Sequence, residues 1–74
     1  MYETIEIKVL ANYKIWLKFN DGEERIIDIL PFLNKGIAKE LLDIKKFSEV
    51  KNDSGGGIYW PNGYDFCPNY LKTL

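Results

Sequence analysis

The sequence contains no histidine and only one cysteine. Without histidine, the chain lacks the commonest general base and the commonest metal ligand of proteins. The single Cys67 excludes an intrachain disulfide and a zinc site built from several cysteines. These absences rule out Ser-His, Cys-His and two-His arrangements within the chain. We therefore expect no catalytic residues, no metal site and no cofactor.

The chain also has no surplus of positive charge and no long apolar run. Its formal net charge is −1, so we expect no nucleic-acid binding by this chain alone. The longest nearly apolar stretch, IIDILPFL, is too short to cross a bilayer. The first residues, MYETIEIKVL, have no basic segment and no cleavage site of a signal peptide. We expect a cytoplasmic protein that does not contact the membrane.

What is present is the composition of a small globular domain. The 74 residues are 46% hydrophobic and 15% aromatic. A chain of this length forms one domain at most, which we expect over residues 1–74. Since each aromatic side chain can bury a large area, a hydrophobic core is expected without disulfides.

Three stretches near the N-terminus alternate between apolar and polar residues, which is typical of half-buried strands. They are IEIKVL, YKIWLKF and ERIIDI. Three-residue loops at 11–13 and 20–22 would join them into a three-stranded antiparallel meander, with Gly22 in a left-handed conformation. The predicted core face comprises Ile5 opposite Phe19, together with Ile7, Val9, Ile15, Leu17, Ile27 and Ile29.

The same register predicts the pairs on the outer face of the meander. A two-residue Asp21-Gly22 loop would instead place apolar side chains opposite charged ones. The three-residue loop is therefore favoured. The outer pairs are Glu6–Lys18–Glu24, Lys8–Trp16–Ile26, Leu10–Lys14 and Lys14–Asp28.

The second half of the chain predicts shorter elements. Helical spacing of Ile37, Leu41 and Leu42 indicates a short helix over residues 37–43 that covers the core face. The stretches FSEVKND and GGIYW indicate a second β-hairpin with its turn at 53–56. Pro68 is suited to the first position of a short C-terminal helix. The fold class is therefore α+β: a meander, a short helix, a second hairpin and a short C-terminal helix.

Several of these stretches together resemble a known bacterial family. They are Phe19-x-Asp-Gly, DILPFL, ELLD, Phe47-x-x-Val50 and WPNGYDF-x-P-x-x-L. The chain resembles the domain of unknown function family 2442 over nearly its whole length. The resemblance implies an α+β fold but no activity. Some longer relatives carry an added helix-turn-helix domain, and some are encoded beside other small proteins. This implies toxin–antitoxin-like or regulatory pairs, without DNA regulation by this chain itself.

The stretch GGGIYWPNGYDF raises the question of a site. In one interpretation it is turn chemistry: Trp60 fills the core, and Pro61, Asn62 and Gly63 turn the chain into the last helix. Asp65 then accepts hydrogen bonds from that turn or from the helix start. In the other interpretation the turn from Trp60 to Asp65 binds a small ligand or performs catalysis. A phosphate-binding loop is disfavoured because no lysine and no directly following helix accompany the glycines.

Cys67 and the aspartates are weaker candidates. Cys67 lies at a predicted helix start, which lowers a thiol pKa, but no histidine can act as its base. We expect it to be a half-buried structural thiol, in a position that a better helix cap would normally take. The spacing of the aspartates matches no calcium loop.

Trp16 leaves two interpretations open. Alternation places it on the outer face, with Leu10 and Ile26 nearby. Either the last helix or a lysine stem covers it, with Lys8 placed for a cation–π contact, or it belongs to a partner surface. We predict a partly exposed Trp16 in contact with another protein or a second copy of the chain. The favoured function is a protein–protein interaction module.

Overall fold

The computed structural model describes residues 2–74 and contains two three-stranded sheets joined by short helices. The predicted α+β class is confirmed. The elements in chain order are β1 (Thr4–Leu10), η1 (Ala11–Tyr13), β2 (Lys14–Phe19), β3 (Glu24–Asp28), η2 (Leu30–Phe32), η3 (Gly36–Leu42), α1 (Ile44–Phe47), β4 (Lys51–Asn52), β5 (Ile58–Tyr59), β6 (Asp65–Phe66) and α2 (Pro68–Leu71), where η marks a 3₁₀ helix.

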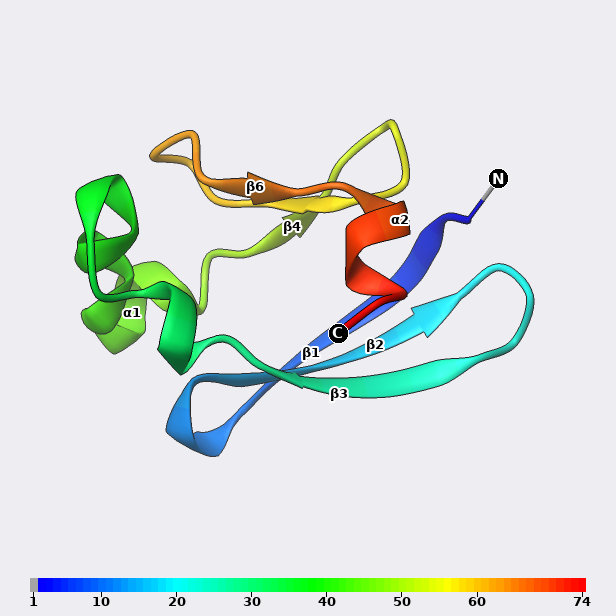
Figure 1. Ribbon diagram of the computed structural model, residues 1–74, viewed down its shortest axis with the longest axis horizontal. Helices are drawn as coiled ribbons and strands as arrows, with labels where there is room; N and C mark the ends of the chain where they lie inside the picture. Colours follow the sequence, from blue (N-terminus) through cyan, green and yellow to red (C-terminus); the bar gives the residue numbers. More distant parts are fainter. Residues whose placement is uncertain (1) are drawn as a thin grey trace.

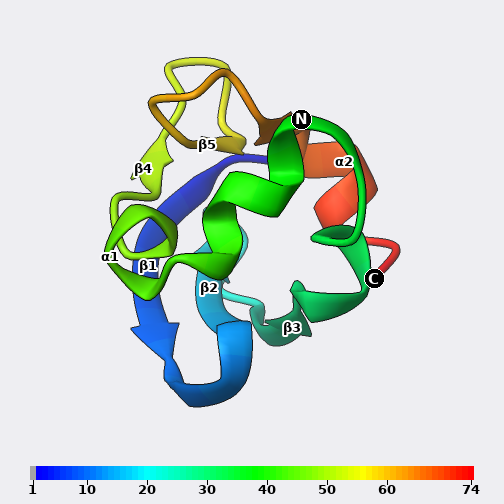
Figure 2. The same cartoon turned by 90° about the vertical axis from the view of Figure 1, so that its left-hand side faces the viewer.

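The two sheets form layers, with all other elements except η1 on one side of the meander. Figure 1 shows β4, β5 and β6 above the meander of β1, β2 and β3, with α2 between the layers near one end. Figure 2 shows the helical segment from η3 to α1 closing the other end. Apart from η1, which joins β1 to β2, no described element lies below the meander in Figure 1. Its outer face is therefore left uncovered by the rest of the fold.

The register predicted for the meander is confirmed on the outer face. Glu6 lies opposite Lys18, Lys8 opposite Trp16, and Leu10 opposite Lys14. On the next strand Trp16 pairs with Ile26, and Lys14 and Lys18 pair with Asp28 and Glu24. The three-residue loops fix this pairing. A slip of one residue would move the apolar side chains of a strand from the core face to the outer face.

The prediction for Ile5 is wrong. Thr4, not Ile5, lies opposite Phe19, because the register shifts between Thr4 and Glu6. The Thr4 amide donates to the Gly56 carbonyl at 2.7 Å, which ties this end of β1 to the loop before β5. A bulge of this kind places two residues opposite one and turns a side chain away. Ile5 is consequently 49% exposed, while Thr4 is buried.

The predicted helix over 37–43 is a 3₁₀ helix, and its buried residues differ from the prediction. Leu41 is buried as predicted, but Ile37 and Leu42 are exposed and Ala38 is buried in their place. In a 3₁₀ helix, residues three apart share a face, so Ala38 and Leu41 point inward together. An α-helical spacing was the wrong period for this segment.

The second sheet contains one more strand than predicted. β6 pairs with β5, placing Ile58 opposite Phe66 and Tyr59 opposite Asp65. The strands predicted over FSEVKND and GGIYW reduce to Lys51–Asn52 and Ile58–Tyr59, and Phe47 ends α1 instead. The turn at 61–63 therefore leads into β6, not into the last helix as predicted.

One turn geometry closes three hairpins. The first residue of the segments 19–23, 53–57 and 60–64 donates its amide to the carbonyl of the fifth, at 2.8 Å in each. The fourth residue donates back to the first at 2.9 Å in each. That fourth residue is Gly22, Gly56 or Gly63, with φ of 90°, 95° and 97°. A type I turn followed by a left-handed residue has this pattern and favours glycine.

A single hydrophobic core joins the two sheets. The core cluster contains Ile15, Leu17 and Phe19 from β2, Ile58 from β5 and Trp60 from the turn that follows β5, and all five are fully buried. Edge and tilted ring contacts connect the aromatic side chains, with Trp60 5.9 Å from Phe47 and 6.1 Å from Phe66 between ring centroids. Such pairs stabilise a core beyond their area alone.

Candidate functional site

The outer face of the meander brings together the residues predicted for an interaction surface. Trp16 is half-buried, Leu10 is half-buried, and Ile26 is 63% exposed. A shallow hollow of about 310 Å³ is lined by Trp16, Glu24, Arg25 and Ile26. The apolar side chains thus form a strip across β2 and β3 with charged neighbours. We call Lys8, Trp16, Glu24 and Ile26 the outer patch.

Two polar contacts hold the Trp16 ring, one over its face and one at its indole nitrogen. The Lys8 ammonium lies 5.1 Å from the ring centroid, as predicted for a cation–π contact. The indole Nε1 donates to Glu24 Oε1 at 3.1 Å. These contacts fix the ring on the sheet while leaving part of it accessible to solvent.

The last helix does not cover Trp16. Leu71 of α2 is fully buried in the core, on the opposite side of the meander. Tyr70 stacks on Phe66 at 6.0 Å between centroids. The interpretation that α2 shields Trp16 is therefore wrong, while Lys8 of the neighbouring strand lies over the ring.

The turn from Trp60 to Tyr64 uses its polar groups to hold the fold together. The Trp60 indole Nε1 donates to the Phe47 carbonyl at 2.8 Å, inside the core. Asn62 Nδ2 donates to the Ile37 carbonyl at 3.0 Å and to Glu40 Oε1 at 3.1 Å. Asn62 Oδ1 accepts from the Tyr64 amide at 3.0 Å. The predicted core position of Trp60 is confirmed.

The roles predicted for Asp65 and Cys67 are wrong. Asp65 lies on β6 and is exposed, and the hydrogen bond expected of it in the turn is accepted by Asn62 instead. Cys67 is exposed, not half-buried, and makes no side-chain cap for α2. Alternation on β6 explains both, since Phe66 faces the core and its two neighbours face outward.

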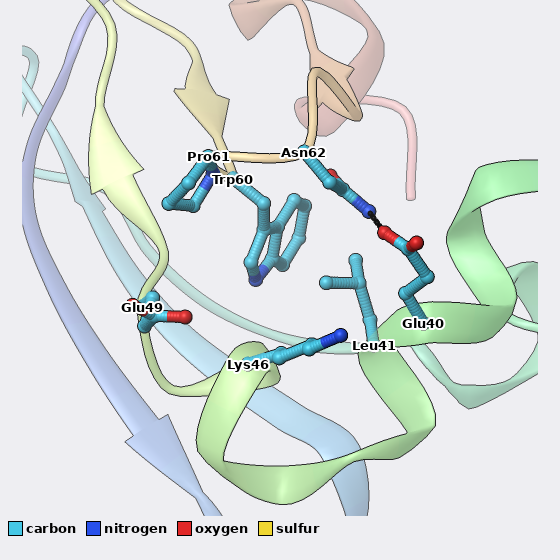
Figure 3. A pocket seen from close by; sticks show the side chains of 7 residues that line it. All are labelled: Glu40, Leu41, Lys46, Glu49, Trp60, Pro61 and Asn62. Carbon is cyan, nitrogen blue, oxygen red and sulfur yellow. Dashed lines mark hydrogen bonds between the residues drawn. The ribbon is translucent and has the colours of Figure 1, made fainter.

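A hollow of about 250 Å³ lies beside the turn, between it and the helical segment. Figure 3 shows Trp60, Pro61 and Asn62 on one side and Leu41 and Lys46 on the other. The dashed line between Asn62 and Glu40 closes one end of it. The polar groups that the turn directs toward the helices are occupied by bonds within the fold.

A ligand pocket lined jointly by Trp60, Tyr64 and Asp65 would have favoured a small-molecule site. In residues 2–74, these three side chains line three different hollows. Partial burial raises the pKa of the Tyr64 phenol above its ordinary value. Tyr64 and Asp65, neighbours in sequence, point to opposite faces of the second sheet, so they do not converge on one ligand.

An ion cluster that the sequence did not reveal links α2 to the second hairpin loop of the meander. Lys72 Nζ lies 2.8 Å from Asp21 Oδ2 and 2.7 Å from Glu23 Oε1. The ammonium also lies 4.8 Å from the Phe19 ring centroid. Hydrogen bonds from Lys72 lower the pKa of both carboxyls, and the two carboxylates raise the pKa of Lys72. Arg25 forms a further ion pair with Glu23.

Within residues 2–74, no group of three or more His, Cys, Asp or Glu side chains is arranged to hold a metal ion. In the same part of the chain, no helix combines the length and apolar character needed to cross a membrane.

The fold and its surfaces define a small α+β domain: two sheets around one aromatic core, with an uncovered outer face. The chain belongs to the family described as protein of unknown function (DUF2442), whose model matches residues 4–74. A search of curated proteins and a search of solved structures each found no match.

Proposed function

We propose that this domain is a protein–protein interaction module that binds another protein through the outer face of the meander. The observation that carries the proposal is that Trp16 is only half-buried and Ile26 is 63% exposed, while the neighbouring residues Ile15, Leu17 and Ile27 of the same strands face the core. A half-exposed tryptophan beside an exposed isoleucine leaves apolar area that a partner would remove from water.

The geometry of the outer patch supports this proposal. The contacts of Lys8 and Glu24 hold the Trp16 ring in one orientation before binding. A fixed aromatic ring loses less conformational freedom on binding than a mobile one. Charged groups of both signs surround it, as in the polar rim of an interface.

The proposal assigns no catalysis to the chain. It is supported by the absence of histidine and by the structural bonds that occupy Trp60 and Asn62. The family resemblance adds the expectation of a toxin–antitoxin-like or regulatory pair, in which this domain recognises the other member, and the composition adds the expectation of a cytoplasmic location.

Quantitative capture from an extract of the native host tests the proposal. We expect Trp16→Ser to reduce the capture of specific partners at least tenfold relative to wild type. Ile44→Ser is the matched control, because Ile44 is 50% exposed on α1, away from the outer patch. Equal capture by Trp16→Ser and wild type would contradict the proposal.

Sedimentation separates a heterologous partner from a second copy. The proposal expects the purified chain to remain monomeric at concentrations at which it binds its partner. A dimer that dissociates in Trp16→Ser would assign the outer face to self-association instead.

A further inference from the structure

We propose that the free edge of β3 accepts an extended segment of the partner as a fourth antiparallel strand. The segment would carry a basic residue, any residue, an apolar residue, any residue and a second basic residue. This inference rests on the proposed function and names the partner's recognition chemistry. The site is the edge of the meander beside the outer patch. Glu24 and Ile26 belong both to this edge and to the outer patch.

The backbone of β3 has an open side. The Ile29 amide donates to the Tyr13 carbonyl, and the Phe19 amide donates to the Glu23 carbonyl, so residues 23 and 29 both face β2. Alternation along an antiparallel strand then turns the backbone groups of 25 and 27 toward β2 and those of 24, 26 and 28 away. Among residues 2–74, β2 is the only strand that pairs with β3. Three consecutive outward positions are therefore open to a new strand.

The side chains at these three positions form an acidic, apolar, acidic row. Glu24, Ile26 and Asp28 alternate on the outer face and are all exposed. Their neighbours on β2 are Lys18, Trp16 and Lys14, in the same order. The fold thus already pairs this row with a basic, apolar, basic strand on one side, and the free side favours the same pattern.

The row disfavours a second copy of β3. An antiparallel pair centred on Ile26 would place Glu24 of one copy opposite Asp28 of the other, and like charges directly opposite are destabilising. Shifting the pair by two residues would place Ile26 opposite a carboxylate. Charge on an exposed edge strand is a known protection against self-pairing, and here it selects a basic strand from another protein.

Synthetic peptides test the recognition chemistry directly. The probe is Thr-Lys-Thr-Val-Thr-Lys-Thr, and the readout is binding measured by amide chemical shifts and by slower hydrogen exchange at Glu24, Ile26 and Asp28. We expect replacement of both lysines by glutamate to weaken binding at least tenfold. Equal binding of both peptides, or no protection of these amides by the lysine peptide, would overturn the inference.

N-methylation of the peptide tests the strand geometry. Methylation at the central Val removes an N–H that faces Ile26 and should abolish binding. Methylation at the following Thr removes an N–H that points away from β3 and should leave binding within about twofold of the parent. Equal effects of the two modifications would contradict strand addition.

Variants of the protein complete the test. Glu24→Gln with Asp28→Asn should lose the preference for the lysine peptide, while retaining oxygens that can accept from the Trp16 indole and the Leu30 amide. Ile26→Pro removes the outward N–H and leaves the bonds to β2 intact, so it should fold and lose peptide binding. Arg25→Pro is the geometric control: its N–H faces β2, so this variant should lose stability.

The host partner distinguishes failure of this inference from failure of the proposed function. If Ile26→Pro captures the partner as wild type does while Trp16→Ser does not, the outer face binds without strand addition and the inference fails alone. If both variants capture the partner as wild type does, the proposed function fails as well.

Discussion

The two sheets of this domain are stabilised in different ways. The meander has strands of 7, 6 and 5 residues, whose side chains alternate between a core face and an outer face. The strands of the second sheet have 2 residues each. Its position depends on Trp60, on glycine turns and on contacts with distant segments. The register of the meander is therefore determined by its own sequence pattern, whereas the second sheet depends on packing against other parts of the fold.

The largest difference between core and surface is expected from replacing the two tryptophans. Trp60→Ala removes a fully buried ring together with its bond to the Phe47 carbonyl, and we expect the free energy of unfolding to fall by about 3–5 kcal/mol. Trp16→Ala removes a half-exposed ring from the meander and should cost only about 1 kcal/mol. Urea unfolding followed by circular dichroism measures both. A larger loss for Trp16→Ala would contradict the assignment of core and surface.

Gly57→Ala tests how closely the second sheet is packed. A Cβ on Gly57 would overlap the Phe66 carbonyl oxygen of β6, so we expect a loss of about 2–3 kcal/mol. Gly55→Ala is the matched control, because its Cβ would meet only Asp53 Oδ1, at 3.8 Å. If the two variants have the same unfolding midpoint, the close approach of β5 and β6 is wrong.

The meander could be predicted almost completely from its sequence. Its alternating stretches are adjacent along the chain and joined by short loops, so charge pairing across neighbouring strands selected the correct register. The exception is Ile5. Its bulge coincides with a bond between Thr4 and Gly56, residues too far apart in the sequence for any local pattern to indicate it.

For the second sheet, the sequence predicted the turns but not the bounds of the strands or the presence of β6. Strands of two residues carry no readable period, and β6 is recognisable only once Phe66 is seen to face the core. The same limit applies to the candidate sites. Alternation placed Trp16 and Ile26 on the outer face, but the contacts of Lys72 join residues 51 and 49 positions apart, and no motif signals them.

The glycine turns should respond alike in the two sheets, because both sheets use the same turn geometry. Gly22 closes the meander and Gly63 closes the second sheet, and an added Cβ would meet no atom within 4 Å at either position. Alanine at each should therefore cost a similar amount, about 1–2 kcal/mol, for the left-handed backbone alone. Gly56→Ala should cost more, because its Cβ would also contact Glu3 at 2.9 Å. Thermal unfolding of the three variants gives the order, and a Gly56→Ala variant as stable as the other two would contradict it.

The smallest effect is expected at the ion cluster that links α2 to the meander. The pKa of Asp21 and Glu23 is lowered below 3.8 and 4.5, so their contribution is present above these values and lost as pH falls through the folded pKa. The pKa of Lys72 is raised above 10.5, so its contribution is lost as pH rises through the folded value. The stability difference between wild type and Lys72→Met should therefore be largest between these limits and shrink at acid and alkaline pH.

Urea midpoints of wild type and Lys72→Met across the pH range measure this dependence. Lys35→Met is the control, since Lys35 lies outside the cluster. A pH-independent difference between wild type and Lys72→Met would show that Lys72 contributes only through its packing on Phe19 and not through its charge.

The central claim is that the meander binds the partner, while the turn from Trp60 to Asp65 builds the fold. Hydrogen exchange of the domain, alone and in complex with its captured host partner, tests this most directly. The account predicts slower exchange on binding at Trp16 and over residues 24–28, with residues 60–65 unchanged. Protection confined to residues 60–65, with β2 and β3 unchanged, would contradict it.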